Sequence, residues 1–253
     1  MSDGWTIGGN ARREEVFLRA YAGPGARRAD VEPASARTPD DLAACLIHTL
    51  LRPDAGRDEV DGACRAALRH GFGAVCVNPR FVSFGAQKLQ DSAVLLCSVV
   101  GFPLGASDTE IKALEARRCV QLGAAEVDMV IPIGALREGA PAAVFRDVAA
   151  VRRETMGLAT LKVIVECGLL ADPQKELACR IAVDAGADYV QTGTGFAGGD
   201  ATLDDVRLLR DAVGPSVGVV AAGGIRDRIT AEAMLAAGAC RLATSHGTAI
   251  LAP

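Results

Sequence analysis

The sequence predicts an α/β protein of the (β/α)8 TIM barrel class with an N-terminal helical extension, and three observations support this prediction. A helical stretch, a glycine stop and a short apolar strand recur four times, marked by Gly71, Gly123, Gly186 and Gly238. Each interval between these glycines holds one further apolar strand, so the repeating unit has the length of a βα unit. The strands are also apolar enough to be buried on both faces, which is typical of parallel barrels.

Eight strands are expected to follow one another along the chain. They lie within the segments ACLIHTL, RHGFGAVCV, LLCSVVGF, EVDMVI, LKVIVE, DAGADYVQT, GVVAAGG and AAGACRLAT. An open doubly wound sheet is the alternative, but no GxGxxG motif follows the first strand. The repeat also continues evenly along the chain, which favours a closed barrel.

The first 37 residues differ in composition from the rest. They predict one short amphipathic helix near Arg12 to Tyr21, followed by a Gly-Pro-Gly break and a polar linker. We interpret residues 1–37 as an arm appended to a barrel domain that covers residues 38–253. Such an arm suits a packing contact between subunits, so a homo-oligomer (a dimer or larger) is expected.

The composition argues against several classes of function. The net charge is −4, and no basic excess indicates a nucleic-acid or anionic-membrane partner. The longest apolar run, AVLLCSVVGF, has the length of a strand and not of a membrane span. The eight cysteines form no CxxC motif, and the three histidines form no HxH or HExxH motif. We therefore expect a cytoplasmic protein with reduced thiols and no metal site.

Two charged residues stand out on neighbouring strands whose C-terminal ends face the expected active site. Asp128 lies among apolar neighbours in EVDMVI, and Lys162 lies in LKVIVE. They should pair, because either charge buried alone would cost several kcal/mol. The pair is either a structural ion pair or an acid/base pair at a substrate pocket, and its place on adjacent barrel strands favours the second.

Glycine clusters follow the last two strands, where barrels commonly bind phosphate. Gly223 and Gly224 allow a ligand to approach the backbone closely, and Ser245 offers a hydroxyl donor. We expect a phosphate-binding site there, whereas tight turns alone are the simpler explanation of the glycines.

Many motifs in one order resemble the deoxyribose-phosphate aldolase (DeoC) family from about Leu42 to Leu251. They are HTLLRPDA, FGAVCVNPRFV, VVGFPLGA, EVDMVIPIGAL, LKVIVECGLL, ADYVQTGTGF, VGVVAAGGIRD and RLATSHGTAIL. The resemblance implies a barrel that joins acetaldehyde to glyceraldehyde 3-phosphate through a lysine Schiff base, without metal or cofactor. It also implies that Asp128 belongs to a proton relay and that Lys162 lines the site without being the nucleophile.

The chain departs from the family at its catalytic positions. Gln191 stands where the family has the Schiff-base lysine of KTSTG, and Val220 replaces the second lysine of GVKxxGG. Ile47 replaces an acidic residue, and His246 replaces a serine of GTSSG. A carboxamide forms no iminium with an aldehyde, so ordinary deoxyribose-phosphate aldolase activity is not expected.

Two main functions and a weaker third follow. The first is a divergent lyase or isomerase acting on a small, phosphorylated carbonyl compound or phosphosugar. Either Lys162 forms the Schiff base, or Gln191 donates a hydrogen bond to the developing oxyanion while Asp128, Lys162 or His246 moves protons. The second is a non-catalytic paralogue that binds a phosphosugar or a protein partner, and the third is weak residual aldolase activity. The residues expected to contact the substrate are Cys76, Thr192, Gly193, Val220, Gly223, Gly224 and Ser245.

Overall fold

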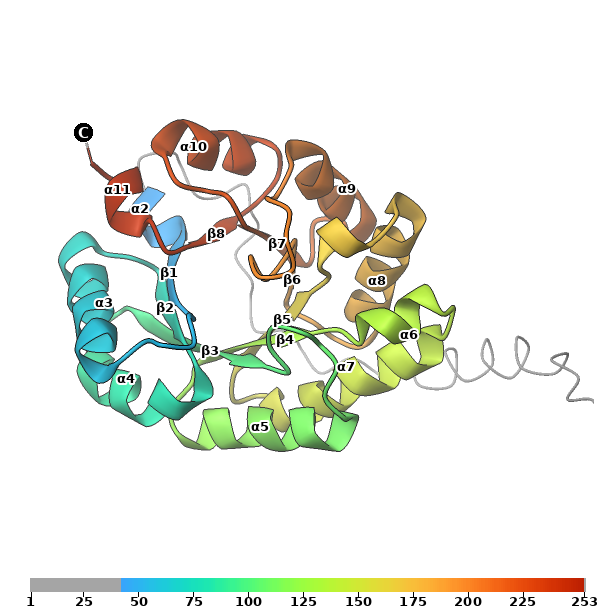
Figure 1. Cartoon of the computed structure of the whole chain (residues 1–253), viewed down its shortest axis with the longest axis horizontal. Coiled ribbons are helices and arrows are strands. Elements are labelled where there is room, and N and C mark those ends of the chain that lie inside the picture. Colours follow the sequence, from blue (N-terminus) through green and yellow to red (C-terminus); the bar gives the residue numbers. More distant parts are fainter. Residues whose placement is uncertain (1–41, 253) are drawn as a thin grey trace, which may run out of the picture.

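The computed structural model of the chain describes residues 42–252, and the predicted N-terminal arm lies outside the described residues. Eight parallel strands close into a barrel in sequence order, with β1 hydrogen-bonded to both β2 and β8. Figure 1 shows the helices arranged as a ring around these strands. The predicted (β/α)8 barrel is therefore confirmed.

The strands are short and each lies within a segment predicted to hold it. Their bounds are β1 Leu46–Leu50, β2 Ala74–Val77, β3 Leu95–Val100, β4 Glu126–Val130, β5 Thr160–Ile164, β6 Tyr189–Gln191, β7 Gly218–Ala222 and β8 Arg241–Thr244.

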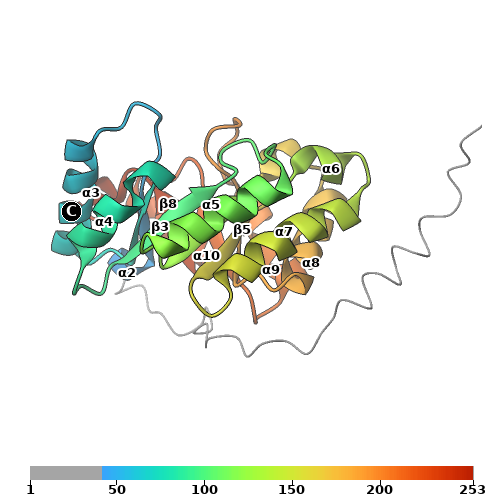
Figure 2. The ribbon, with the colours of Figure 1, turned by 90° about the horizontal axis from the view of Figure 1, so that it is seen from below.

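Helices fill the intervals between the strands. Their bounds are α2 Leu42–Cys45, α3 Arg57–His70, α4 Val82–Leu89, α5 Thr109–Gln121, α6 Ile133–Arg137, α7 Pro141–Thr155, α8 Asp172–Asp184, α9 Leu203–Val213, α10 Arg228–Ala236 and α11 Gly247–Ile250, with short 3-10 turns at Pro79–Phe81 and Cys167–Leu169. Seen from the side in Figure 2, α5 and α7 run next to each other along the outside of the barrel. No helix in the described part of the chain is long and apolar enough to cross a membrane.

The glycines that mark the predicted repeat have a common backbone conformation. Gly71, Gly123, Gly186 and Gly238 all have positive φ, between 69° and 116°. L-residues with side chains avoid this region, so glycine is the favoured residue for turning the chain from each helix into the next strand. The positive φ at these four positions therefore explains why a glycine marks each repeat.

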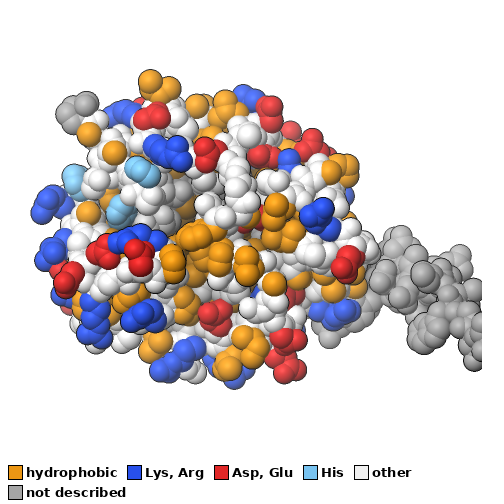
Figure 3. All heavy atoms as spheres, viewed as in Figure 1, with side chains coloured by type: hydrophobic (Ala, Val, Ile, Leu, Met, Phe, Trp, Pro, Cys, Tyr) orange, Lys and Arg blue, Asp and Glu red, His pale blue; other side chains and the backbone are white. Residues whose placement is uncertain are grey.

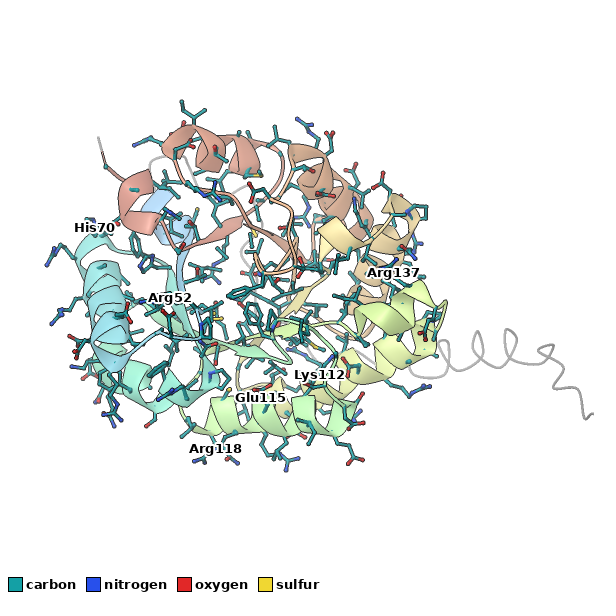
Figure 4. The ribbon with its side chains drawn as sticks, viewed as in Figure 1. Arg52, His70, Lys112, Glu115, Arg118 and Arg137 are labelled. Atoms are coloured by element: carbon teal, nitrogen blue, oxygen red, sulfur yellow. The ribbon has the colours of Figure 1, made fainter. Side chains whose placement is uncertain are left out.

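Helix α5 illustrates how the outer layer holds the barrel loops. The Lys112 ammonium is fully buried and lies 2.7 Å from Asp147 on α7, and Glu115 accepts a hydrogen bond from the Gly101 backbone after β3. In Figure 4, Lys112 and Glu115 lie on the barrel side of the helix, whereas Arg118 points outward. These contacts fix the loop after β3, which carries Phe102 to the pocket described below.

The interior of the barrel contains two kinds of side chain. One group is small and apolar, and consists of Ile47, Ala74, Cys76, Cys97, Val99, Val220, Ala222 and Ala243. The other group is charged, and we call it the buried charge cluster: Glu126, Asp128, Lys162 and Arg241, each at most 6% exposed. The small side chains leave space in the barrel at the C-terminal ends of the strands, and this space is the candidate site.

Candidate functional site

A pocket of about 300 Å³ opens at the C-terminal ends of the strands. Side chains at or after all eight strands contribute to its lining. On the face seen in Figure 3, histidine and apolar side chains gather around a hollow at the middle of the ring. Seven of the residues predicted from the sequence line the pocket: Cys76, Asp128, Gln191, Gly223, Gly224, Ser245 and His246.

Lys162 does not line the pocket, because the buried charge cluster encloses its ammonium group. Lys162 Nζ lies 2.8 Å from Glu126 Oε2, 2.9 Å from Asp128 Oδ1 and 3.3 Å from Cys97 Sγ. Arg241 forms an ion pair with the other oxygen of Glu126. The pairing of Asp128 with Lys162 is as predicted, but the sequence reasoning missed Glu126 and Arg241 as partners in it.

The pKa values within the buried charge cluster differ in a chemically useful way. Burial would lower the pKa of Lys162, but the charges of Asp128, Cys97 and Glu126 hold it well above its usual value. Burial would raise the pKa of Glu126, but Lys162 and Arg241 lower it to about 2. For Asp128, burial outweighs the attraction of Lys162, and the pKa is raised. Asp128 is therefore the carboxyl group of the cluster whose pKa lies above its usual value, whereas that of Glu126 lies below it.

Asp128 is also the cluster member that lines the pocket. Its second oxygen, Oδ2, lies 3.8 Å from the Cys76 thiol, which lines the pocket as well. A carboxyl group with a raised pKa at the bottom of a cavity suits general acid/base catalysis. The Lys162 ammonium contacts the other oxygen of this carboxyl group, Oδ1, and does not line the pocket itself.

Three side chains form the one group among residues 42–252 with the spacing of metal ligands. The Sγ atoms of Cys76 and Cys97 and a carboxylate oxygen of Asp128 all lie within 4.8 Å of one another. A metal would need thiolates, but burial and the nearby thiol and carboxylate groups raise the pKa of Cys97 well above its usual value. The Lys162 ammonium already contacts Cys97 and Asp128, so this group fits a lysine cation better than a metal ion.

Gln191 ends β6 at the pocket wall, between two apolar neighbours. The strand register places Ile164 on one side of it and Val220 on the other. Its Nε2 donates a hydrogen bond of 2.9 Å to the Gly193 carbonyl, whereas Oε1 is buried and has no hydrogen-bond partner among the described residues. Gln191 is only 5% exposed, so this free acceptor is a notable exception to the rule that buried polar atoms are paired.

Three predicted substrate contacts support the pocket wall without lining it. Thr192 Oγ1 donates to the Ala222 carbonyl and accepts from the Ala222 amide, which fastens β6 to β7. Gly193 lies against Glu166, where a Cβ atom would come within 2.8 Å of a carboxylate oxygen. Val220 is fully buried in the small apolar group of the barrel interior. In the structure these residues shape the pocket, and their contact with substrate stays a prediction.

The loops after β7 and β8 form the end of the pocket predicted to bind phosphate. Gly223 and Gly224 have φ of 108° and 74°, and a Cβ atom on Gly224 would come within 2.3 Å of the Asp200 carboxyl carbon. Ser245 Oγ lies 3.1 Å from Nδ1 of His246, and both side chains are exposed to the pocket.

Two pocket arginines were not predicted from the sequence. Arg52 follows β1 and forms ion pairs with Asp54 and Glu59, so its charge is largely compensated. Arg226 directly follows the glycine pair and Ile225, is exposed, and makes no ion pair or hydrogen bond among the described residues. A cation two residues after a double glycine, in a loop expected to bind phosphate, was the signal that could have identified Arg226.

Two aromatic rings form the mouth of the pocket. Phe102, after β3, and Phe196, after β6, contact each other edge to face, with ring centroids 5.2 Å apart. Both rings line the pocket, and Phe196 is 48% exposed. They give the mouth of the pocket an apolar rim.

Comparisons with known proteins agree on one family. The family model described as DeoC/LacD family aldolase matches residues 47–251. Deoxyribose-phosphate aldolase 1 of Bacillus licheniformis is 49% identical over 210 residues, which cover 83% of this chain and 94% of that protein. Deoxyribose-phosphate aldolase of Brevibacillus brevis is 50% identical over 206 residues, covering 81% and 93%.

Solved structures give the same result. A putative deoxyribose-phosphate aldolase from Coccidioides immitis matches with a TM-score of 0.82 and 34% identity, and the match covers 94% of both chains. The deoxyribose phosphate aldolase of Aeropyrum pernix, described as having a unique tetrameric structure, matches with a TM-score of 0.79 and 34% identity over 85% of this chain and 91% of that one.

Proposed function

The chain belongs to the DeoC/LacD aldolase family, and on that premise we propose that it is an aldolase-type lyase or isomerase that uses no Schiff base. Its substrate is a small phosphorylated carbonyl compound, bound in the pocket at the C-terminal ends of the strands. The observation that carries this proposal is that two paired buried residues differ in their access to the pocket and in their expected charge. Asp128 reaches the pocket with a raised pKa, and Lys162 is enclosed as an ammonium group behind it.

A Schiff base needs a neutral amine at the pocket, and the structure offers no lysine that meets this requirement. The pKa of Lys162 is raised well above its usual value, so the neutral amine is disfavoured. The other lysines of the chain, Lys88, Lys112 and Lys175, are ion-paired and none of them lines the pocket. The covalent version of the mechanism therefore has no structural support among the described residues.

Asp128 can perform the proton transfers of an aldol cleavage. As a carboxylate it takes the proton of the substrate hydroxyl that lies β to the carbonyl. The carbon–carbon bond then breaks as this oxygen becomes a carbonyl, and the bonding electron pair moves into an enolate. Return of the proton from Asp128 to the enolate carbon completes the second product. The same base, acting on a carbon-bound proton next to the carbonyl, would give isomerisation.

The phosphate group sets the orientation of the substrate in this proposal. Arg226 and Ser245 offer a positive charge and a hydroxyl at one end of the pocket, beside the Gly223–Gly224 turn against which the Asp200 side chain packs. Asp128 lies on the opposite side of the barrel, on β4. A substrate anchored by its phosphate at β7 and β8 would thus extend its carbon chain across the pocket towards Asp128.

The oxyanion-donor role expected for Gln191 is not part of this proposal. Its Nε2 donates to the Gly193 carbonyl, and the atom without a partner is the acceptor Oε1. Nε2 carries a second hydrogen, so the donor role stays a prediction, whereas the proposal made below uses the unpartnered Oε1.

The relatives define the first substrate to test, because those compared are named deoxyribose-phosphate aldolases. We expect the unaltered chain to cleave deoxyribose 5-phosphate or a related phosphosugar slowly, and Asp128→Asn to lower kcat by about 10²- to 10⁴-fold with binding retained. The assay is aldehyde release, together with exchange of substrate carbon-bound protons in D₂O followed by NMR. Asp211→Asn, on an exposed part of α9, is the matched control and should behave like the unaltered chain. Equal turnover by Asp128→Asn and the control would contradict the assignment.

A binding protein without catalysis is the second candidate, and one observation favours it. Lys162 is locked in ion pairs while the pocket stays open, which is what a phosphosugar-binding paralogue would retain. Ligands that raise the melting temperature without turnover or proton exchange would establish this candidate in place of the enzyme. The predicted oligomer, the N-terminal arm and the cytoplasmic location stay predictions under either function.

A further inference from the structure

The Gln191 side chain carries a buried acceptor that no described residue satisfies. Oε1 is buried and unpartnered, and Gln191 lines the pocket from the end of β6. A buried acceptor without a hydrogen bond is costly, and native structures keep few of them. Because Gln191 lines the pocket, a bound molecule that reaches Oε1 is the natural source of the missing donor.

The orientation of the amide follows from its other contact. The Gly193 carbonyl can only accept a hydrogen bond, so the amide end that faces it at 2.9 Å must be the NH₂ group. Oε1 is then the end turned away from Gly193. Exchanging the two ends would place two acceptors against each other, which is repulsive.

The neighbouring wall cannot supply the donor either. The residues in register with Gln191 on both adjacent strands are Ile164 and Val220, and both are fully buried and apolar. The Thr192 hydroxyl, next in sequence, is already committed to the backbone of Ala222. The acceptor is therefore isolated from other protein donors on β5, β6 and β7.

We propose that Gln191 Oε1 accepts a hydrogen bond from a hydroxyl group of the ligand, and that this bond determines which phosphorylated compounds the pocket selects. This inference rests on the proposed function, which places the phosphate group of the ligand. It adds that the ligand must also carry a hydroxyl group that reaches Gln191. The favoured ligands are phosphorylated hydroxyaldehydes, hydroxyketones and their alcohols. Compounds of the same length and charge without the hydroxyl leave Oε1 unpaired and bind more weakly.

A pair of unreactive probes tests this requirement. Glycerol 3-phosphate and propyl phosphate share a three-carbon chain and a phosphate group, but only the first carries hydroxyl donors. Calorimetric titration of the unaltered chain should give an affinity for glycerol 3-phosphate about tenfold or more above that for propyl phosphate. Gln191→Met removes the acceptor at similar size and should bring the ratio close to one.

Two further variants separate the role of the acceptor from damage to the fold. Gln87→Met makes the same substitution on the exposed surface of α4 and should keep the full ratio. Gln191→Glu keeps an acceptor at this position and should keep a preference for the hydroxylated probe, even though it loses the bond to Gly193. The ratio measured for the unaltered chain needs no variant at all, so the proposal remains testable if Gln191→Met folds poorly.

The outcomes distinguish this inference from the function on which it rests. Equal affinity of the unaltered chain for the two probes would overturn the hydroxyl requirement and leave the phosphate site intact. If both probes and inorganic phosphate fail to bind, the phosphate site itself is wrong and the proposed function falls with it. Retention of the full ratio by Gln191→Met would also overturn the inference, since another group would then be reading the hydroxyl.

Discussion

The buried charge cluster and the end of β6 at Gln191 lie in the same barrel but differ in how their buried polar atoms are paired. In the cluster, Lys162 contacts two carboxylates and a thiol, and Arg241 shares Glu126 with it. At the wall, Gln191 has one amide end bonded to Gly193 and the other end free. Both regions are almost completely buried, so burial alone does not distinguish a structural polar group from one that awaits a ligand.

The contrast comes from the residues on the adjacent strands. Asp128 and Lys162 are register partners on β4 and β5, so two opposite charges meet directly across the ladder. Gln191 has Ile164 and Val220 as its partners, which offer no donor. Complementary neighbours yield a closed ion-pair network, whereas apolar neighbours leave the amide oxygen without a hydrogen-bond partner. The position that the family resemblance assigns to the Schiff-base lysine thus becomes a hydrogen-bonding position here.

The largest expected effect on stability comes from a substitution in the buried charge cluster. Lys162→Met removes the cation between Glu126 and Asp128 and leaves Asp128 buried without its ion partner. Removing one member of a buried ion pair typically costs about 3–5 kcal/mol, so we expect a loss of this size in the free energy of unfolding, measured by urea titration. Lys88→Met, at an exposed pair with Asp61, should cost less than about 1 kcal/mol. Similar small losses for both variants would show that the cluster does not stabilise the barrel.

The pH dependence of the unfolding free energy tests the ion pairs of Glu126 in the buried charge cluster. The pKa of Glu126 is about 2 in the folded chain against a usual value near 4.5, because Lys162 and Arg241 favour its carboxylate over the opposing effect of burial. A carboxyl group with a lowered pKa in the folded state stabilises the fold above its unfolded pKa, and this stabilisation is lost as the pH falls. The unfolding free energy should therefore decrease between about pH 4.5 and pH 2. In Glu126→Gln this part of the pH dependence should be absent, and an unchanged profile in that variant would refute the assignment.

The sequence predicted the fold and the Asp128–Lys162 pair because both depend on regular patterns. Four positive-φ glycines revealed the repeat, and strand alternation turned Asp128 and Lys162 towards the barrel interior. Glu126 shares the parity of Asp128 on β4, so its inward direction was readable from the same rule. Its partner Arg241 lies 115 residues away, and only closure of the barrel brings the two together.

The state of individual atoms could not be predicted in the same way. The free Oε1 of Gln191 depends on where the Gly193 carbonyl points after β6, and this is a property of one loop conformation. Lys162 is excluded from the pocket because Glu126 and Asp128 hold its ammonium group, and this depends on the side-chain positions of residues on two strands, β4 and β5. Arg226 was not predicted because one arginine in a loop belongs to no periodic pattern that distinguishes it from other arginines, although its charge suits the phosphate expected there.

The most direct test of the central claim is borohydride trapping of the unaltered chain, followed by intact and peptide mass spectrometry. The chain is incubated with deoxyribose 5-phosphate and a panel of phosphorylated and free aldehydes and ketones. The double variant Gln191→Lys, Val220→Lys serves as the positive control, because it restores both lysines that the family resemblance expects. A Schiff-base-free mechanism predicts no reduced adduct on any lysine of the unaltered chain under conditions where the double variant is trapped at position 191. A reduced adduct on Lys162 of the unaltered chain would contradict this mechanism and show that the buried ammonium group becomes the nucleophile.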